Sequence, residues 1–172
     1  TGDMHFETAY TTAPNTEHPE LDGLGPVFNN QDCNSCHQRD GRSSTITIAE
    51  DQTRVLLGSD AGIFLRISID DGQCAEPTLD NNYCQNVGVD GFGTQLFHRG
   101  VLKARADWQE NPFIGQANVY ISYEYSTATY ADGSTTELKK PIVTIEKPYD
   151  TDDENPGNSA LLQANVRYSP RN

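Results

Sequence analysis

Long hydrophobic runs are missing from this chain. No stretch approaches the roughly 20 consecutive apolar residues that a membrane-spanning helix requires, and no charged-then-apolar leader follows Thr1. We therefore expect no membrane span, and we expect the chain to be a mature or trimmed product.

Basic residues are also scarce, with 12 Lys and Arg against 25 Asp and Glu and a formal net charge of −13. Phosphate groups and anionic lipids repel such a surface, so nucleic acid is not expected as a partner. The negative charge either keeps the protein soluble or steers a basic partner toward it.

Apolar residues are few for a globular protein. They make up 35% of 172 residues, alongside 14 Gly and 9 Pro, and the mean hydropathy is −0.66. The length fits one domain, residues 1–172, with enough chain to bury a core. The composition predicts a loop-rich domain whose core needs an additional apolar component.

Only four cysteines are present, and two of them belong to Cys33-Asn34-Ser35-Cys36-His37. This C-x-x-C-H pentad is the attachment signature of c-type haem. Two thiols three positions apart can form thioethers with the two vinyl groups of one haem, and the adjacent imidazole can bind the iron. We predict one covalent haem c, with Cys33 and Cys36 as anchors and His37 as the proximal ligand.

Three other uses of this cysteine spacing compete with haem. A thioredoxin-like couple is expected beside a βαβ pattern, whereas residues 20–32 offer Gly, Pro and Asn. A zinc site needs a second ligand pair, and Cys74 and Cys84 lack the spacing of a zinc finger. A local disulfide remains the third alternative.

Cys74 and Cys84 lie in a segment, 70–90, that is rich in Gly, Asp and Asn. A disulfide between them would fasten this long loop. Disulfides form in oxidising compartments, so the two cysteine pairs together predict a periplasmic or secreted protein.

The sixth iron position separates electron transfer from catalysis. The usual thioether ligand is nearly excluded, because the only methionine, Met4, precedes the pentad. We predict His98, which stands among apolar residues, as the second axial ligand, although a hydrogen-bonded or surface role is equally open. Met4 and His5, on the first expected helix, are lesser candidates, water is another, and His18 is more often a plain loop residue.

Several further residues are open to two interpretations. Arg39 and Arg42 follow the pentad closely, so they either pair with the haem propionates or remain exposed charges. The acidic loop 149–158 is expected to be solvated, with a calcium site as a minor alternative. One tryptophan and four of the eight tyrosines are predicted to be core and sheet residues, with a role as radical relays as the lesser alternative: Trp108, Tyr120, Tyr123, Tyr125 and Tyr130.

The pattern of apolar residues predicts a mainly α, cytochrome c-like haem core with β insertions in the form of a hairpin or small antiparallel sheet. Helices are expected at 3–11, over the pentad, and at 92–105. Strands are expected at 44–49, 54–57, 63–69, 117–125 and 137–145. Ala131-Asp132-Gly133-Ser134 predicts a hairpin turn between the last two strands.

Several segments resemble the di-haem oxidoreductase family, which is related to the bacterial di-haem cytochrome c peroxidases. The most specific match is the segment from Gly23 to Asn30 (GLGPVFNN), followed by the pentad and by Arg39-Asp40-Gly41-Arg42. Further matches span most of the chain: Leu65 to Ser68, Gly93 to Leu96, Tyr130 to Gly133, Leu138 to Pro141, and Ser169 to Arg171.

The resemblance implies a longer protein with a second haem pentad and peroxidase-like or related oxidative chemistry. This sequence has one pentad, so it resembles the amino-terminal portion of such a protein or a single-haem relative. The family tends to carry an acidic residue where His98 stands, and this departure implies a newly occupied distal site.

Two functions are therefore predicted in order of preference. The first is one-electron transfer through a single covalent haem, with a redox protein or a further domain of a longer chain as partner. The second is part of a peroxidase-like enzyme with an open distal position, in which Gln95 or His98 assists peroxide cleavage and a second haem supplies electrons. A structural or sensing haem is a third alternative.

Overall fold

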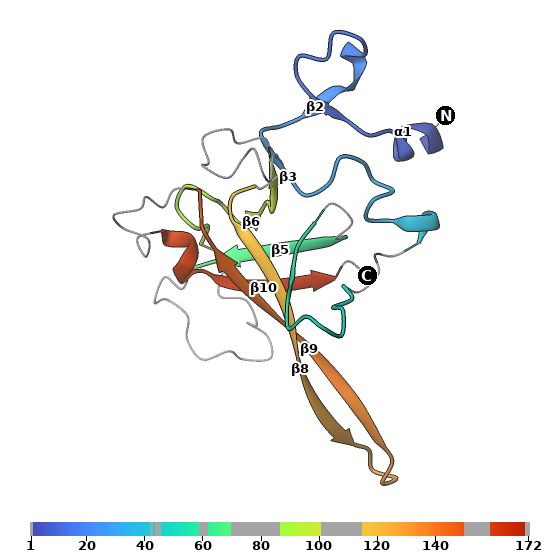
Figure 1. Cartoon of the computed structure of the whole chain (residues 1–172), viewed down its shortest axis with the longest axis vertical. Helices are drawn as coiled ribbons and strands as arrows, with labels where there is room; N and C mark the ends of the chain where they lie inside the picture. Colours follow the sequence, from blue (N-terminus) through green and yellow to red (C-terminus); the bar gives the residue numbers. More distant parts are fainter. Residues whose placement is uncertain are drawn as a thin grey trace.

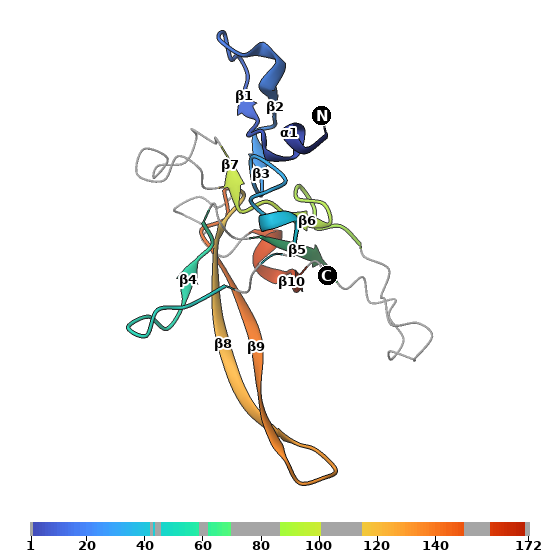
Figure 2. The ribbon, with the colours of Figure 1, turned by 90° about the vertical axis from the view of Figure 1, so that its right-hand side faces the viewer.

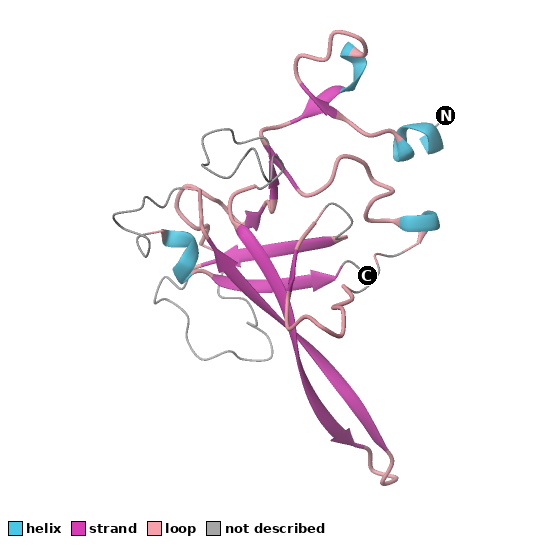
Figure 3. Ribbon diagram, in the orientation of Figure 1, coloured by secondary structure: helices cyan, strands magenta, loops and turns pink. Residues whose placement is uncertain are grey.

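Strands dominate the part of the chain that the computed structural model describes, which comprises residues 2–41, 43, 46–58, 62–69, 87–100, 115–149 and 159–170. Figure 3 shows that helix is confined to short segments. These are the α-helix α1 (Gly2–Glu7) and three 3₁₀ helices, η1 (Pro19–Leu21), η2 (Gln38–Asp40) and η3 (Ala160–Gln163). The predicted mainly α cytochrome fold is therefore wrong.

The described strands form four small sheets. β1 (Thr11–Thr12) pairs in parallel with β2 (Asp22–Leu24), and β3 (Val27–Phe28) pairs antiparallel with β7 (Arg99–Gly100). The third sheet places β5 (Ile63–Ser68) between β10 (Asn165–Pro170) and β6 (Gln95–Leu96). The fourth places β8 (Asn118–Thr129) between β4 (Val55–Leu56) and β9 (Thr135–Glu146).

The core lies where β5 and the first part of β8 are packed with the segments around them. Alternate residues of β5, namely Ile63, Leu65 and Ile67, are buried, and so are Val119 and Ile121 of β8. This alternation follows from the two-residue period of side chains in a strand. Leu57, Val89, Phe92, Leu96, Ala117 and Leu161 complete the buried cluster.

Figures 1 and 2 show the far halves of β8 and β9 projecting from the body as a two-stranded arm. The arm is in register from Asn118 opposite Glu146 to Thr129 opposite Thr135. The turn lies where the Asp-Gly signal predicted it, with Gly133 at a φ of +83°. The predicted hairpin is thus confirmed, with longer strands than expected.

Other predicted elements differ from the structure. The helix at 3–11 ends at Glu7, and the described part of 44–49 is not a strand. The helix at 92–105 is wrong over its described part, because residues 92–100 contain a turn followed by β6 and β7. Gly91 and Gly93 adopt positive φ angles there, which L side chains rarely tolerate and which end regular helix.

Some predictions fall outside the described residues. These include the disulfide between Cys74 and Cys84, the placement of Trp108, and most of the loop 149–158. No helix in the described ranges is long and apolar enough to cross a membrane.

Candidate haem site

The pentad lies in the connection between β3 and η2, and it forms a single hydrogen-bonded turn in place of the predicted helix. The carbonyl oxygen of Cys33 accepts hydrogen bonds from the backbone amides of Cys36, at 3.1 Å, and His37, at 3.0 Å. Asp32 caps this turn, since its carboxylate accepts from the Ser35 amide at 2.6 Å and from the Ser35 hydroxyl at 2.9 Å. A capping carboxylate of this kind stabilises a turn that is too short to stabilise itself.

Cys33 and Cys36 are both free thiols in the structure, but their surroundings differ. Cys33 is exposed, whereas Cys36 is half-buried. The backbone of Cys36 lies against Gly62 at the start of β5, where a Cβ atom added to Gly62 would stand 3.3 Å from the Cys36 Cα. Cys36 is therefore packed closely against the residue that precedes β5.

His37 closes the turn, and its ring is oriented by a backbone contact. Its Nδ1 lies 3.0 Å from the carbonyl oxygen of Gly41. A carbonyl only accepts hydrogen bonds, so in the neutral imidazole Nδ1 carries the proton and Nε2 keeps its lone pair. The Phe6 ring of α1 lies 6.1 Å from the His37 ring, centroid to centroid, and the Phe6 carbonyl accepts a hydrogen bond from the Asn34 amide.

A polar chain connects the Cys36 sulfur to β7. Asn30 Nδ2 donates to Cys36 Sγ at 3.0 Å, and Arg99 Nη1 donates to Asn30 Oδ1 at 3.4 Å. Arg99 stands opposite Phe28 in the β3–β7 ladder, and its guanidinium lies 5.1 Å from the centroid of the Phe28 ring. Arg99 is buried, with 6% of its surface exposed.

His98 directly precedes β7. Among the described residues, it makes no hydrogen bond with the pentad. Asn29 directly follows β3, whose Phe28 pairs with Arg99. Both residues are buried, and the ring nitrogens of His98 and the amide atoms of Asn29 make no hydrogen bond with the residues the structure describes.

Burial lowers the pKa of His98 from its ordinary value of 6.5 to about 4. The backbone of Gly58, which approaches the ring without forming a good hydrogen bond, opposes this shift, and the charge of Arg99 adds to it. His98 is therefore a neutral imidazole at pH 7. Its role as an axial ligand stays a prediction.

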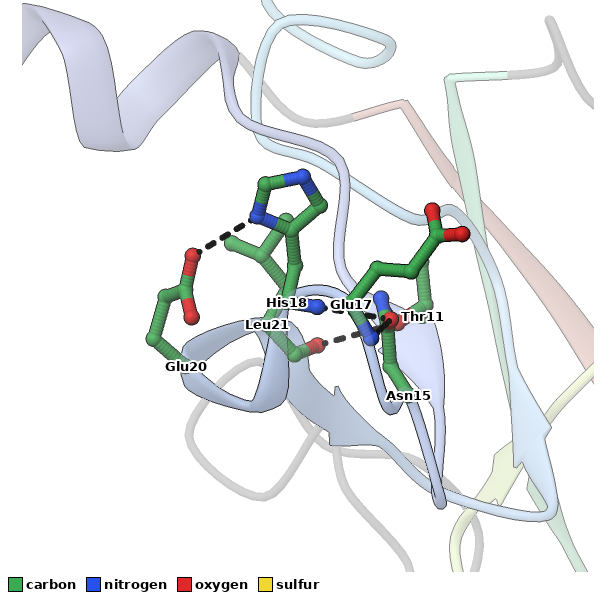
Figure 4. A network of polar contacts seen from close by, with 6 residues as sticks. All are labelled: Thr11, Asn15, Glu17, His18, Glu20 and Leu21. Atoms are coloured by element: carbon green, nitrogen blue, oxygen red, sulfur yellow. Dashed lines mark hydrogen bonds and ion pairs between the residues drawn. The ribbon is translucent and has the colours of Figure 1, made fainter.

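The other predicted ligands lie at the surface. Met4 and His5 are exposed on α1. His18 precedes η1, where its Nδ1 lies 3.1 Å from Glu20 Oε1 and its amide donates to Asn15, as Figure 4 shows. This network holds His18 in an exposed loop.

Of the two predicted propionate partners, Arg39 is exposed at a φ of +56°, and Arg42 lies outside the described residues. Gln95, a candidate for peroxide cleavage, is half-buried in β6 opposite Arg66 of β5. Sequence analysis overlooked Arg99 and Asn30. One feature of the sequence could have pointed to Arg99. It is a charged residue that follows the apolar residues Leu96 and Phe97 closely and directly precedes Gly100.

The comparisons with known proteins identify the family. The family model described as "Di-haem oxidoreductase, putative peroxidase" matches residues 1–172. The chain belongs to this family. The suspected resemblance is thereby confirmed, and with it a general redox function that depends on haem. Neither the curated proteins nor the solved structures gave a match.

The pentad fits the group that this family binds. The thiols of Cys33 and Cys36 are free, as thioether formation requires, and the His37 tautomer leaves Nε2 available for iron. Within the described ranges, no three or more His, Cys, Asp or Glu residues gather as a metal cluster, so the zinc alternative gains no support there. Cys33, Cys36 and His37 would hold the haem, which supplies one-electron redox chemistry when bound.

Proposed function

We propose that this chain carries one covalent haem c at Cys33, Cys36 and His37 and passes single electrons through it. The proposal rests mainly on one observation: within a single capped turn, two unpaired thiols accompany an imidazole whose Nε2 is left free by the Nδ1 contact to Gly41. These are the donors that covalent attachment and proximal ligation require.

Electron transfer is favoured over peroxide cleavage by this chain alone because the sequence carries one pentad, whereas the family is described as di-haem. One pentad supplies only one of the two haems that a di-haem enzyme carries, so single-electron transfer is the chemistry proposed for this chain by itself. The chain therefore acts as a relay for a redox partner protein or for a further haem domain of a longer chain.

We propose a location in the periplasm or outside the cell for this protein. Attachment of haem through a C-x-x-C-H pentad is expected outside the bacterial cytoplasm, where Cys74 and Cys84 would also oxidise. The net charge of −13 favours a partner with a basic docking surface.

The decisive experiment is expression in a bacterial host with a haem-attachment system for the periplasm. The denatured, acid-extracted chain should retain one haem per molecule by mass, and its redox titration should follow a one-electron curve. The double variant Cys33→Ser, Cys36→Ser should lose all covalent pigment. A colourless wild-type chain with the mass of its amino acids alone would refute the proposal.

Spectroscopy then decides the sixth position. A low-spin ferric spectrum that turns high-spin in His98→Ala would establish His98 as the axial ligand, and an unchanged spectrum would remove it. A high-spin wild type that rapidly binds cyanide or carbon monoxide would instead favour the peroxidase-like alternative with an open distal site.

A further inference from the structure

The two attachment thiols of the pentad are held unequally. Cys36 is half-buried, its backbone lies against Gly62, and its sulfur accepts a hydrogen bond from Asn30. Cys33 is exposed, and its thiol has no hydrogen-bond partner among the described residues. The direction of the Cys36 sulfur is therefore fixed by its neighbours, whereas the Cys33 sulfur is free to choose its rotamer.

The Asn30 side chain also contacts Arg99. Its Oδ1 accepts from the buried Arg99, and an amide that accepts through oxygen must present its nitrogen on the other side. Arg99 in turn is fixed by the β3–β7 ladder and by the Phe28 ring. The Arg99 contact therefore favours the amide orientation in which the Asn30 nitrogen faces Cys36.

We propose that Asn30, oriented by Arg99, is a positioning residue for haem attachment that directs the Cys36 thiol toward the vinyl group it bonds. This inference rests on the proposed function. In the attachment step the S–H bond adds across the vinyl double bond: sulfur bonds to one carbon, and the hydrogen goes to the other. The addition is balanced and consumes neither oxidant nor reductant.

An N–H group pointing at sulfur restricts the Cys36 side chain to a direction that the haem must match. Correct orientation of a reacting group can greatly favour a reaction. One hydrogen bond of this kind contributes a modest net free energy. Its loss should therefore bias attachment without abolishing it, and the bias should fall on Cys36 alone.

The sharpest variant is Asn30→Asp, which keeps the oxygen that Arg99 contacts and removes the Nδ2 donor. Asn30→Ala removes both contacts. Asn34→Ala is the matched control, because Asn34 is a half-buried asparagine of the same turn whose side chain makes no hydrogen bond with the described residues. Arg99→Lys tests the orienting contact while keeping the positive charge.

All variants are matured in the periplasm, denatured and alkylated, and the cysteine-containing peptides are then quantified by mass spectrometry. In Asn30→Asp and Asn30→Ala the fraction of haem-bearing chains with a free Cys36 should rise roughly threefold to tenfold, the range expected for one lost hydrogen bond. Free Cys33 should not change. The haem spectrum in alkaline pyridine should shift in parallel, since one vinyl group then remains unsaturated.

Arg99→Lys should show a smaller rise at Cys36, and Asn34→Ala should match the wild type. The inference would be overturned if the Asn30 variants had both thioether bonds in the same fraction of haem-bearing chains as the wild type. It would also be overturned if Cys33 and Cys36 lost their thioether bonds equally. A wild-type chain without covalent haem would instead be a failure of the proposed function, so the two failures are distinguishable.

Discussion

His37 and Gly41 are joined by a contact of 3.0 Å between the imidazole Nδ1 and the glycine carbonyl oxygen. The contact spans the whole of η2, from its N-cap to its C-cap, so the turn that follows the pentad also orients its imidazole. A hydrogen bond from the second nitrogen of a metal-binding histidine fixes the tautomer and increases the basicity of the ligating nitrogen. The backbone thus orients His37 for its proposed role as the proximal ligand.

The variant His37→Ala tests this role. The haem should remain covalently attached, because the thioethers do not involve the imidazole, but the ferric spectrum should lose its imidazole-ligated features. Imidazole added to the solution should restore much of the wild-type spectrum by filling the vacated position. His18→Ala is the control, since His18 is exposed and engaged with Glu20, and its spectrum should equal that of the wild type. An unaltered spectrum in His37→Ala would remove His37 from the iron.

Burial of His98 predicts a specific dependence of stability on pH. The pKa of His98 is about 4 in the folded chain, against an ordinary value of 6.5. Between pH 6.5 and pH 4 the imidazole is therefore protonated in the unfolded state but neutral in the folded state. The folded state is therefore destabilised as the pH falls from 6.5 toward 4, by up to about 3 kcal/mol. Above pH 6.5 the effect vanishes.

His98→Phe should remove this dependence. The phenyl ring is similar in shape and leaves no unpaired ring nitrogens, so at pH 7 its stability should equal or exceed that of the wild type. Urea denaturation of both proteins at pH 7 and pH 4.5 measures the change in the free energy of unfolding with pH. The contribution of the carboxylates to this change is the same in both chains, so the difference between the chains reports on His98. Parallel loss of stability in both proteins would show that His98 is not buried as a neutral group.

The sequence allowed prediction of the features that depend on local patterns. The Cys33–His37 spacing, the alternation in Ile63 to Ile69, and the Asp132-Gly133 turn each determine structure within a few residues, and the structure has the strand and the hairpin where they were expected. The pentad as a haem site agrees with the family.

The fold class could not be predicted in the same way. Strands of two residues, such as β3, β6 and β7, carry no periodicity, and their pairing partners lie far away in the sequence: Phe28 pairs with Arg99. The apolar spacing in 92–105 fits a helix equally well until the tertiary pairing of β6 with β5 is known. The Asn30–Arg99 contact depends on the pairing of β3 with β7, so it could not be predicted from the sequence either.

Gly62 offers a test of how the pentad is attached to the β body. A Cβ atom there would stand 2.5 Å from the Ser43 Cβ and 3.3 Å from the Cys36 Cα. Gly62→Ala should lower the free energy of unfolding by about 1 to 3 kcal/mol, as overpacking does, and should reduce the haem content per chain. Gly25→Ala is the control, because the nearest atom to its Cβ is 3.8 Å away. Denaturant titration and the haem-to-protein ratio check both variants, and wild-type values for Gly62→Ala would contradict the close packing.

The turn between β8 and β9 lies at the tip of the arm, far from the body (Figure 1), and it contains Gly133. Its φ of +83° favours glycine, and the turn is closed by hydrogen bonds between Tyr130 and Ser134 and from Ser134 to Asp132. Gly133→Ala should reduce stability by about 1 kcal/mol, whereas Gly133→Asn should cost less because Asn tolerates positive φ. Neither variant should alter the haem spectrum, since the turn shares no described contact with the pentad. Denaturation midpoints and absorption spectra measure both effects, and equal midpoints for the Ala and Asn variants would show that backbone strain at this turn does not limit the stability of the fold.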